Sequence, residues 1–246
     1  MLVPLLLILF PSQSPEIITG ISLAVVFFNA LSGSVTYARM KRIDYKSGLL
    51  FSSATVPGAI LGALSTKYIP HHWFNVTFGL LLLAIAIYLF ISPERTPSTT
   101  KADTPQGHIQ CRIAGPNGAI HTFSYDPRLG IVLSLAVGYL SSLLGIGGGI
   151  IHVPVLVNFL NFPVHIATAT SHFILAVTAF AATVVHVWTG TLQHEVGYTL
   201  CLAVGVLFGA PVGAWLSNRL HGKWIIRGLA LALVLVGVRL LVMATT

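Results

Sequence analysis

The sequence has very few charged residues. Asp, Glu, Lys and Arg make up 8% of its 246 residues, and only 6 residues are acidic. Soluble globular domains carry about 25% charged residues, so this shortage excludes a fold that faces water on all sides. Hydrophobic residues supply 55% of the chain, and its mean hydropathy is +0.87. The composition therefore predicts a protein whose surface faces mainly lipid.

Several chemical signatures are also missing. The 2 cysteines, Cys111 and Cys201, lie in a polar and an apolar stretch, so neither a disulfide framework nor a zinc site is indicated. The sequence has no Gly-x-Ser-x-Gly or His-Glu-x-x-His motif, and its acidic residues lie nearly all in loops, which leaves few groups for acid–base catalysis. Basic residues gather at the ends of apolar runs rather than among aromatics. We therefore expect no enzyme, no cofactor and no nucleic-acid partner, and a lipid bilayer as the surroundings.

Long apolar runs alternate with polar loops. A helix of about 20 residues spans the ~30 Å hydrocarbon core, so each uninterrupted run suits one crossing. Residues 1–10 are too few to cross and lack the basic start of a signal peptide, so we expect half of a membrane element there. The predicted fold class is an all-α polytopic membrane protein. Its apolar runs are 16–38, 47–66, 73–91, 129–160, 165–188, 196–217 and 224–243.

The two halves of the sequence resemble each other. Residues 151 positions apart match at several places, among them Thr19 with Thr170 and Gly58 with Gly209. Small residues are common in any membrane helix, so the shared register of the matches, rather than any single match, indicates an internal repeat.

A polar linker separates the halves. We divide the chain into a first membrane repeat (1–92), which is short at its N-terminus, a linker (93–128) and a second membrane repeat (129–246). Within the linker, residues 109–114 and 119–123 flank a Gly-Pro-Asn-Gly turn, which indicates a small β-hairpin.

Loop charges give the expected orientation. Residues 39–46 hold four basic residues against one acid, whereas residues 189–195 hold one acid and a histidine. The positive-inside rule then places 39–46 and 93–128 in the cytoplasm and 189–195 outside, in the plasma (inner) membrane. Equivalent loops lie on opposite sides, so we expect two inverted repeats. Counting crossings then requires the interrupted run 129–160 to turn back as re-entrant half-helices, broken at glycines.

The interruption of that run is rich in glycine. Gly145, Gly147, Gly148 and Gly149 release the backbone from helical angles, and Pro154 suits the first turn of a new helix. The freed N–H groups would point into a cavity at the positive end of a helix dipole, which favours an anion. The alternative is that the glycines only permit close packing of helices. We predict all four glycines as substrate-binding residues.

Hydroxyls and N–H groups near helix starts form a second set of candidate ligands. They open the run 165–188 and have a counterpart in the first half, and they suit anion binding without a fixed charge. The alternatives are hydroxyls bonded to their own helix and amides bonded between helices. The predicted substrate-binding residues of this set are Thr168, Thr170, Ser171, His172, Thr19, Gly20, Ser22 and Asn29.

Histidines are unusually frequent inside the second repeat. His165, His172 and His186 share one helical face, and His152 lies in the preceding element. Ionisable groups inside a membrane are functional by default, so His152 and His172 are candidates for proton coupling, with structural hydrogen bonding as the alternative. A histidine-containing redox or metal protein is the alternative function. We predict no metal site, because the other long spans offer no mid-membrane histidine as a partner.

Together these motifs resemble a known family. Residues 144–151 with Val153 and Pro154, the Ala-Thr-Ala-Thr-Ser stretch at 167–171 and the 209–214 stretch are similar to the TauE/SafE sulfite-exporter family, and the resemblance covers nearly the whole chain outside the linker. It implies a secondary transporter or facilitator of small sulfur-containing anions, such as sulfite and sulfoacetate, with these glycines and hydroxyls at its site. The first half departs from the pattern, because no glycine-rich break precedes its own Val-Pro. Another small organic anion as substrate, and a homo-oligomeric state, stay open.

Overall fold

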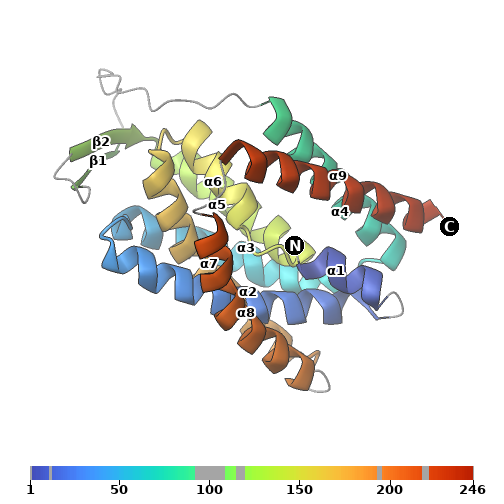
Figure 1. Ribbon diagram of the computed structural model, residues 1–246. Helices are drawn as coiled ribbons and strands as arrows, with labels where there is room; N and C mark the ends of the chain where they lie inside the picture. The colour runs from blue at the N-terminus through green and yellow to red at the C-terminus, as the bar shows by residue number, and fades with distance from the viewer. Residues whose placement is uncertain are drawn as a thin grey trace.

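The computed structural model describes residues 2–10, 13–91, 109–114, 120–192, 196–217 and 222–245. In this part of the chain, helices are packed along one another and a two-stranded hairpin lies at one end (Figure 1). The elements are α1 (Leu2–Leu9), α2 (Pro15–Arg39), α3 (Tyr45–Thr66), α4 (His71–Ile91), β1 (Ile109–Ala114), β2 (Ile120–Tyr125), α5 (Pro127–Leu144), α6 (Gly149–Asn158), α7 (Val164–Trp188), α8 (Val196–Ser217) and α9 (Gly222–Thr245).

Five of these helices are long and apolar enough to cross a membrane. They are α2, α3, α4, α5 and α7. The shortest of their membrane-spanning segments has 18 residues and is about 27 Å long at 1.5 Å per residue. Helices α8 and α9 carry shorter apolar stretches, Val196–Gly209 and Leu231–Val242. The prediction of a helical, integral membrane protein is confirmed.

Short polar side chains determine where several helices begin. Ser14 caps α2 by accepting a hydrogen bond from the Ile17 N–H, Asp44 caps α3, and Asp126 caps α5. A proline occupies the first turn of α2 and of α5, where its missing N–H has no helical partner to lose. Helix α5 ends at Gly145, whose left-handed conformation (φ +65°) stops the helix.

Helices α3 and α5 run parallel and touch backbone to backbone. Gly58 faces Leu135 of α5, and four residues further along Gly62 faces Tyr139. A Cβ added at either glycine would lie 2.3 Å from the facing carbonyl oxygen, which is closer than atoms can approach. Small residues therefore determine this contact, as is common between membrane helices.

Helices from the two halves pair in opposite directions. In α2, Gly20 lies against His186 of α7. Gly33, which is 13 residues later in α2, lies against His172, which is 14 residues earlier in α7. Helices α4 and α9 also pair closely, with Gly79 against Gly237. Because contacts move up one helix as they move down the other, α2 and α7 are antiparallel.

The chain turns back after α5. Gly145 lies against Thr19 near the start of α2, and the short helix α6 then leads to Leu160, which lies against Gly130 in the first turn of α5. The break and α6 therefore return the chain to the end of the bundle at which α5 begins, and α7 starts from that end.

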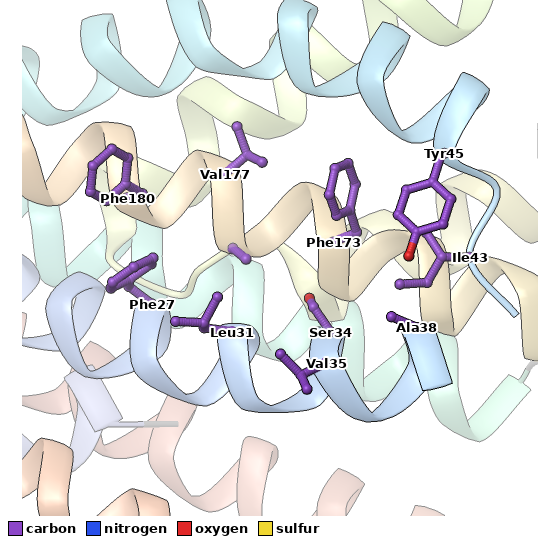
Figure 2. A pocket seen from close by; sticks show the side chains of 11 residues that line it. Phe27, Leu31, Ser34, Val35, Ala38, Ile43, Tyr45, Phe173, Val177 and Phe180 are labelled. Atoms are coloured by element: carbon purple, nitrogen blue, oxygen red, sulfur yellow. The ribbon is translucent and has the colours of Figure 1, made fainter. Parts of the chain in front are cut away.

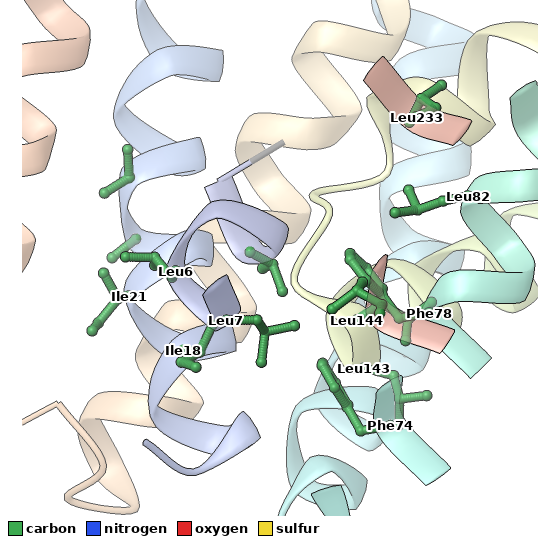
Figure 3. Packing of buried hydrophobic residues seen from close by; sticks show 14 of the residues in the cluster. Leu6, Leu7, Ile18, Ile21, Phe74, Phe78, Leu82, Leu143, Leu144 and Leu233 are labelled. Atoms are coloured by element: carbon green, nitrogen blue, oxygen red, sulfur yellow. The ribbon is translucent and has the colours of Figure 1, made fainter. Parts of the chain in front are cut away.

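The largest apolar cluster ties the first half of the chain to the second. It includes Val3 and Leu7 of α1, each 1% exposed. Burial of these side chains in the cluster therefore stabilises the position of α1, which is too short to cross the membrane. Figure 3 shows this cluster, with side chains from α1, α2, α4, α5 and α9; its labelled members are Leu6, Leu7, Ile18, Ile21, Phe74, Phe78, Leu82, Leu143, Leu144 and Leu233.

The hairpin is docked on the helices by aromatic side chains. Strands β1 and β2 are antiparallel, with Ile109 opposite Tyr125. Phe123 and Tyr125 are buried, and their rings lie 4.4 Å and 5.3 Å from the ring of Phe162, between α6 and α7. Residues 92–108 and the turn at 115–119, which the sequence places in the linker, lie outside the described residues.

A polar network joins the same end of the bundle. The Tyr125 hydroxyl lies 2.7 Å from Ser47 Oγ, which donates to the carboxylate of Asp44. The Asp44 N–H in turn donates to Thr170 Oγ1 of α7 at 3.1 Å. We call this end, formed by residues 40–47, 123–130 and 160–170, the hairpin end.

Candidate functional site

The break between α5 and α6 requires glycine at three positions. Gly145, Gly147 and Gly148 have φ values of +65°, +76° and +66°, a region that residues with a Cβ rarely adopt. A Cβ would also lie 2.8 Å from Val3 at Gly145 and 2.4 Å from Val26 at Gly147. Both conformation and space therefore exclude larger residues here.

A small buried cavity lies beside this break. Its volume is about 10 Å³, which is about the minimum for one water molecule. The lining comes from α3, α5, the break, α6 and α7, so it is built where the two halves meet. The residues are Thr55, Val137, Gly138, Ser141, Gly147, Gly148, His152, Leu175 and Thr178.

Two of the residues that line this cavity have a side-chain atom that is buried without a hydrogen-bond partner among the described residues. The atoms are Ser141 Oγ and His152 Nε2, in residues that are 1% and 3% exposed. The backbone N–H groups of Gly147 and Gly148 likewise donate to no carbonyl in the described chain. An unsatisfied buried polar group costs about 1–3 kcal/mol, so two such side chains among the residues that line one cavity make it the candidate site for a hydrogen-bonding ligand.

The electrostatic character of the cavity comes from neutral groups. No Asp, Glu, Lys or Arg lines it, and its one titratable side chain is His152. Thr178 Oγ1 donates to Thr55 Oγ1 at 3.0 Å, so these two hydroxyls are already paired. The N-terminus of α6, which begins at Gly149, adds the positive end of a helix dipole. The arrangement suits a small acceptor held by hydrogen bonds.

Of the residues predicted from the sequence, Gly147, Gly148 and His152 meet at this cavity. Gly149 opens α6 next to it. Gly145 faces away, where its carbonyl oxygen accepts a hydrogen bond of 2.7 Å from Ser22 Oγ.

The other predicted hydroxyls bond inside the protein, away from the cavity. Thr19, Thr168 and Ser171 each donate to a carbonyl three or four residues earlier in their own helix. Thr170 accepts from the Asp44 N–H, as described above. No residue from this predicted set is among those that line the cavity.

The remaining predicted residues pack between α2 and α7. His172 Nδ1 lies 3.1 Å from the Thr168 carbonyl oxygen, and its ring is 5.2 Å from that of Tyr37. Gly20 lies against the ring of His186, and Asn29 is half-buried in α2. Among the described residues, no group of three or more His, Cys, Asp or Glu residues is close enough to hold a metal ion.

Sequence reasoning missed Ser141, Thr55 and Thr178. All three residues carry a hydroxyl group and lie inside apolar runs, and the sequence contains no other feature that points to them. The same feature is shared by many residues that bond to their own helix, such as Thr183 and Ser65.

Comparisons with known proteins agree on a family. The model of the family described as sulfite exporter TauE/SafE matches residues 1–240. A probable membrane transporter protein, YunE of Bacillus subtilis, is 33% identical over 233 residues, which cover 95% of this chain and 83% of that protein. The probable membrane transporter protein MJ0441 of Methanocaldococcus jannaschii is 24% identical over 212 residues, covering 83% of this chain and 71% of the relative. No solved structure matches the chain.

Proposed function

This chain belongs to the sulfite exporter TauE/SafE family and is a membrane transporter, and we propose that its substrate is a small sulfur oxyanion or sulfonate bound at the cavity beside the glycine break. Sulfite and sulfoacetate are the substrates to test first. The observation that carries this proposal is the pair of unpartnered buried atoms, Ser141 Oγ and His152 Nε2, at one cavity.

The chemistry of the lining supports an oxyanion as the ligand. Oxygens of sulfite and sulfonate groups accept hydrogen bonds, and Ser141 and the two glycine N–H groups are donors. His152 donates through Nε2 in one tautomer and in its charged form. Neutral donors hold an anion without the strong attraction of a lysine or arginine, so the anion can also leave, as transport requires.

The size of the cavity indicates a closed state. A space of about 10 Å³ holds one water molecule and is too small for a sulfite ion. Binding therefore requires α3, α5 and α7 to move apart around the break. We propose that substrate enters and leaves through alternating movements of the two halves.

An inverted repeat would provide these movements, and the positions of the helices support it. Helices α3 and α8 are 151 residues apart at both ends, and α2 and α7, α4 and α9, and α1 and α6 follow nearly the same offset. The equivalent pair α2 and α7 is antiparallel, as a pseudo-twofold axis in the membrane plane requires. In this interpretation α5 and α6 are the re-entrant pair, and the break between them lies at the substrate site.

We assign the hairpin end to the cytoplasm. The 39–46 loop at this end carries four basic residues, and its one acid, Asp44, is buried against Ser47. An excess of Lys and Arg in short loops is typical of the cytoplasmic side. His152 is our candidate for proton coupling, because it is the only titratable side chain in the cavity lining.

Transport is tested with purified protein in liposomes loaded with sulfite, sulfoacetate, sulfate or acetate. We expect efflux of sulfite or sulfoacetate to exceed that of acetate, and the panel also tests the alternative of a carboxylate substrate. Absence of flux for both sulfur anions would contradict the proposed substrate class.

The site is tested with a matched pair of neighbouring serines. Ser141→Ala removes a donor from the cavity, whereas Ser142→Ala removes an equally buried, unpartnered hydroxyl from a residue outside the lining. Neither change breaks a hydrogen bond, so both variants should fold. We expect Ser141→Ala to raise the apparent KM by about 2- to 12-fold, corresponding to about 0.5–1.5 kcal/mol, and Ser142→Ala to leave it unchanged. Equal KM values for the two variants would contradict the proposal that the substrate binds at this cavity.

A further inference from the structure

A second cavity is much larger and has a different character. It is an open groove of about 440 Å³ between α2 and α7, closed at one end by the start of α3 (Figure 2). Helix α2 contributes Phe27, Leu31 and Val35, and α7 contributes Phe173, Val177 and Phe180. This lining offers almost no hydrogen-bonding group, so the groove is unsuited to the transported anion.

The length of the groove is about half the thickness of the hydrocarbon core of a bilayer. It follows α2 from Phe27 to Ala38, which is about 16 Å at 1.5 Å per residue, and the hydrocarbon core is ~30 Å thick. Ile43 and Tyr45 line one end of the groove, so this end lies at the hairpin end of the bundle. Its length and position match the acyl region of a single lipid leaflet.

Basic residues lie next to that end of the groove along the chain, between and beside the lining residues Ala38, Ile43 and Tyr45. Arg39, Lys41 and Lys46 are exposed, and Arg42 is half-buried. The only acid nearby in the loop, Asp44, is 7% exposed and accepts hydrogen bonds from the N–H and hydroxyl of Ser47. Four cations therefore lie where an acyl chain in the groove would carry its headgroup.

One residue of the groove lining has a buried polar atom without a hydrogen-bond partner in the part of the chain that the structure describes. Ser34 Oγ is buried without a hydrogen-bond partner among the described residues, in a residue that is 8% exposed. Figure 2 shows the Ser34 side chain pointing from α2 into the space between α2 and α7. It lies five residues, or about 8 Å, below Arg39 along the helix. A lipid ester carbonyl, just below the phosphate, is a suitable acceptor.

We propose that this groove binds an acyl chain of an anionic phospholipid, with the lipid phosphate at the 39–46 loop. The volume favours an acyl chain over a helix from a second copy of the protein. A helix about 10 Å wide and 16 Å long occupies roughly 1,250 Å³, about three times the volume of the groove. The inference does not depend on the identity of the transported substrate.

The acyl part of the proposal is tested by filling the groove. Val177→Trp places a large side chain in the lining, whereas Val184→Trp makes the same change two turns along α7, at a position 49% exposed and outside the groove. Native mass spectrometry of the purified protein with added phosphatidylglycerol then measures the lipid bound per chain. We expect Val177→Trp to lower the apparent affinity by about tenfold or more, and Val184→Trp to bind like the parent protein.

The headgroup part is tested by removing charge. Lys41→Gln combined with Lys46→Gln should weaken phosphatidylglycerol binding by about thirtyfold at low salt, since each cation near an anionic lipid contributes about 1 kcal/mol. Lys67→Gln, an exposed lysine at the other end of α3, is the control and should have no effect. Phosphatidylcholine with the same acyl chains should bind more weakly than phosphatidylglycerol to the parent protein.

Several outcomes would overturn the proposal. One is unchanged phosphatidylglycerol binding in both Val177→Trp and the double lysine variant. Another is equal binding of the two lipids, which would remove the role of the basic loop. Competition by inorganic phosphate alone would indicate a free-anion site. A change of oligomeric state in Val177→Trp with unaltered lipid binding would assign the groove to a second copy of the chain.

Discussion

The contact between α3 and α5 provides the sharpest prediction, because the sequence contains its own control. Gly58 of α3 lies at the α5 backbone, where a Cβ would be 2.3 Å from the Leu135 carbonyl oxygen and 3.0 Å from the Tyr139 nitrogen. A Cβ added 151 positions later, at Gly209 of α8, would meet no heavy atom of the described residues within 4 Å, apart from its chain neighbours and its own helix backbone. We therefore compare Gly58→Ala with Gly209→Ala.

The expected difference follows from the geometry. Real Cβ atoms essentially never approach closer than 3.0 Å, so Gly58→Ala requires α3 and α5 to separate by at least several tenths of an ångström. Overpacking of this kind costs about 1–3 kcal/mol. Both substitutions gain the same helix propensity from alanine, about 1 kcal/mol, so that contribution cancels in the comparison. For a chain of this length, the midpoint of thermal unfolding should be lower for Gly58→Ala by roughly 2–12 °C.

The assay is thermal unfolding of both variants in the same detergent, followed by fluorescence and by the fraction that elutes as a folded peak. Gly58→Leu and Gly209→Leu extend the series, and we expect only the former to abolish folded material. Equal losses at both positions would refute the reasoning, since they would mean that another helix covers this face of α8. No loss at either position would show that α3 and α5 are not in backbone contact.

Three further substitutions test other parts of the structure. Gly148→Ala should reduce sulfite flux and destabilise the protein by about 1–2 kcal/mol, because its left-handed conformation disfavours a side chain; flux and the unfolding midpoint are both measured. His152→Gln should abolish the acceleration of sulfoacetate efflux by an imposed proton gradient, measured in the same liposomes, and an unaltered acceleration would exclude this residue from proton coupling. Tyr125→Phe removes a hydroxyl 2.7 Å from Ser47 Oγ and should make the hairpin easier to cleave by protease, whereas Tyr68→Phe, 81% exposed, should have no such effect; equal cleavage would show that the network does not hold the hairpin.

Much of the architecture follows from local chemistry in the sequence. The shortage of charge and the long apolar runs require helices in lipid, because the bilayer core cannot satisfy an open backbone. The break at Gly145, Gly147 and Gly148 is equally local, since the left-handed backbone there admits few other residues. The caps at Ser14, Asp44 and Asp126 are local in the same sense.

The identity of the hydroxyls at the candidate site was beyond local reasoning. A serine or threonine in any membrane helix can bond to the carbonyl one turn before it, and Thr19, Thr168 and Ser171 do so. The sequence alone cannot distinguish these from Ser141, which has no such bond and lies at the cavity. The distinction depends on which neighbour each helix face meets.

Composition, periodicity and backbone freedom are properties of short segments, so the sequence alone was enough to predict a helical membrane protein with a glycine break where two helices meet. Its motifs around that break also carry the resemblance to the TauE/SafE family. Three features could be read only from the folded chain: Ser141 and His152 share a cavity, the hairpin is packed on Phe162, and α2 and α7 leave a groove beside the basic loop. These features arise from contacts between residues far apart in the chain, and such contacts depend on how whole helix faces fit together.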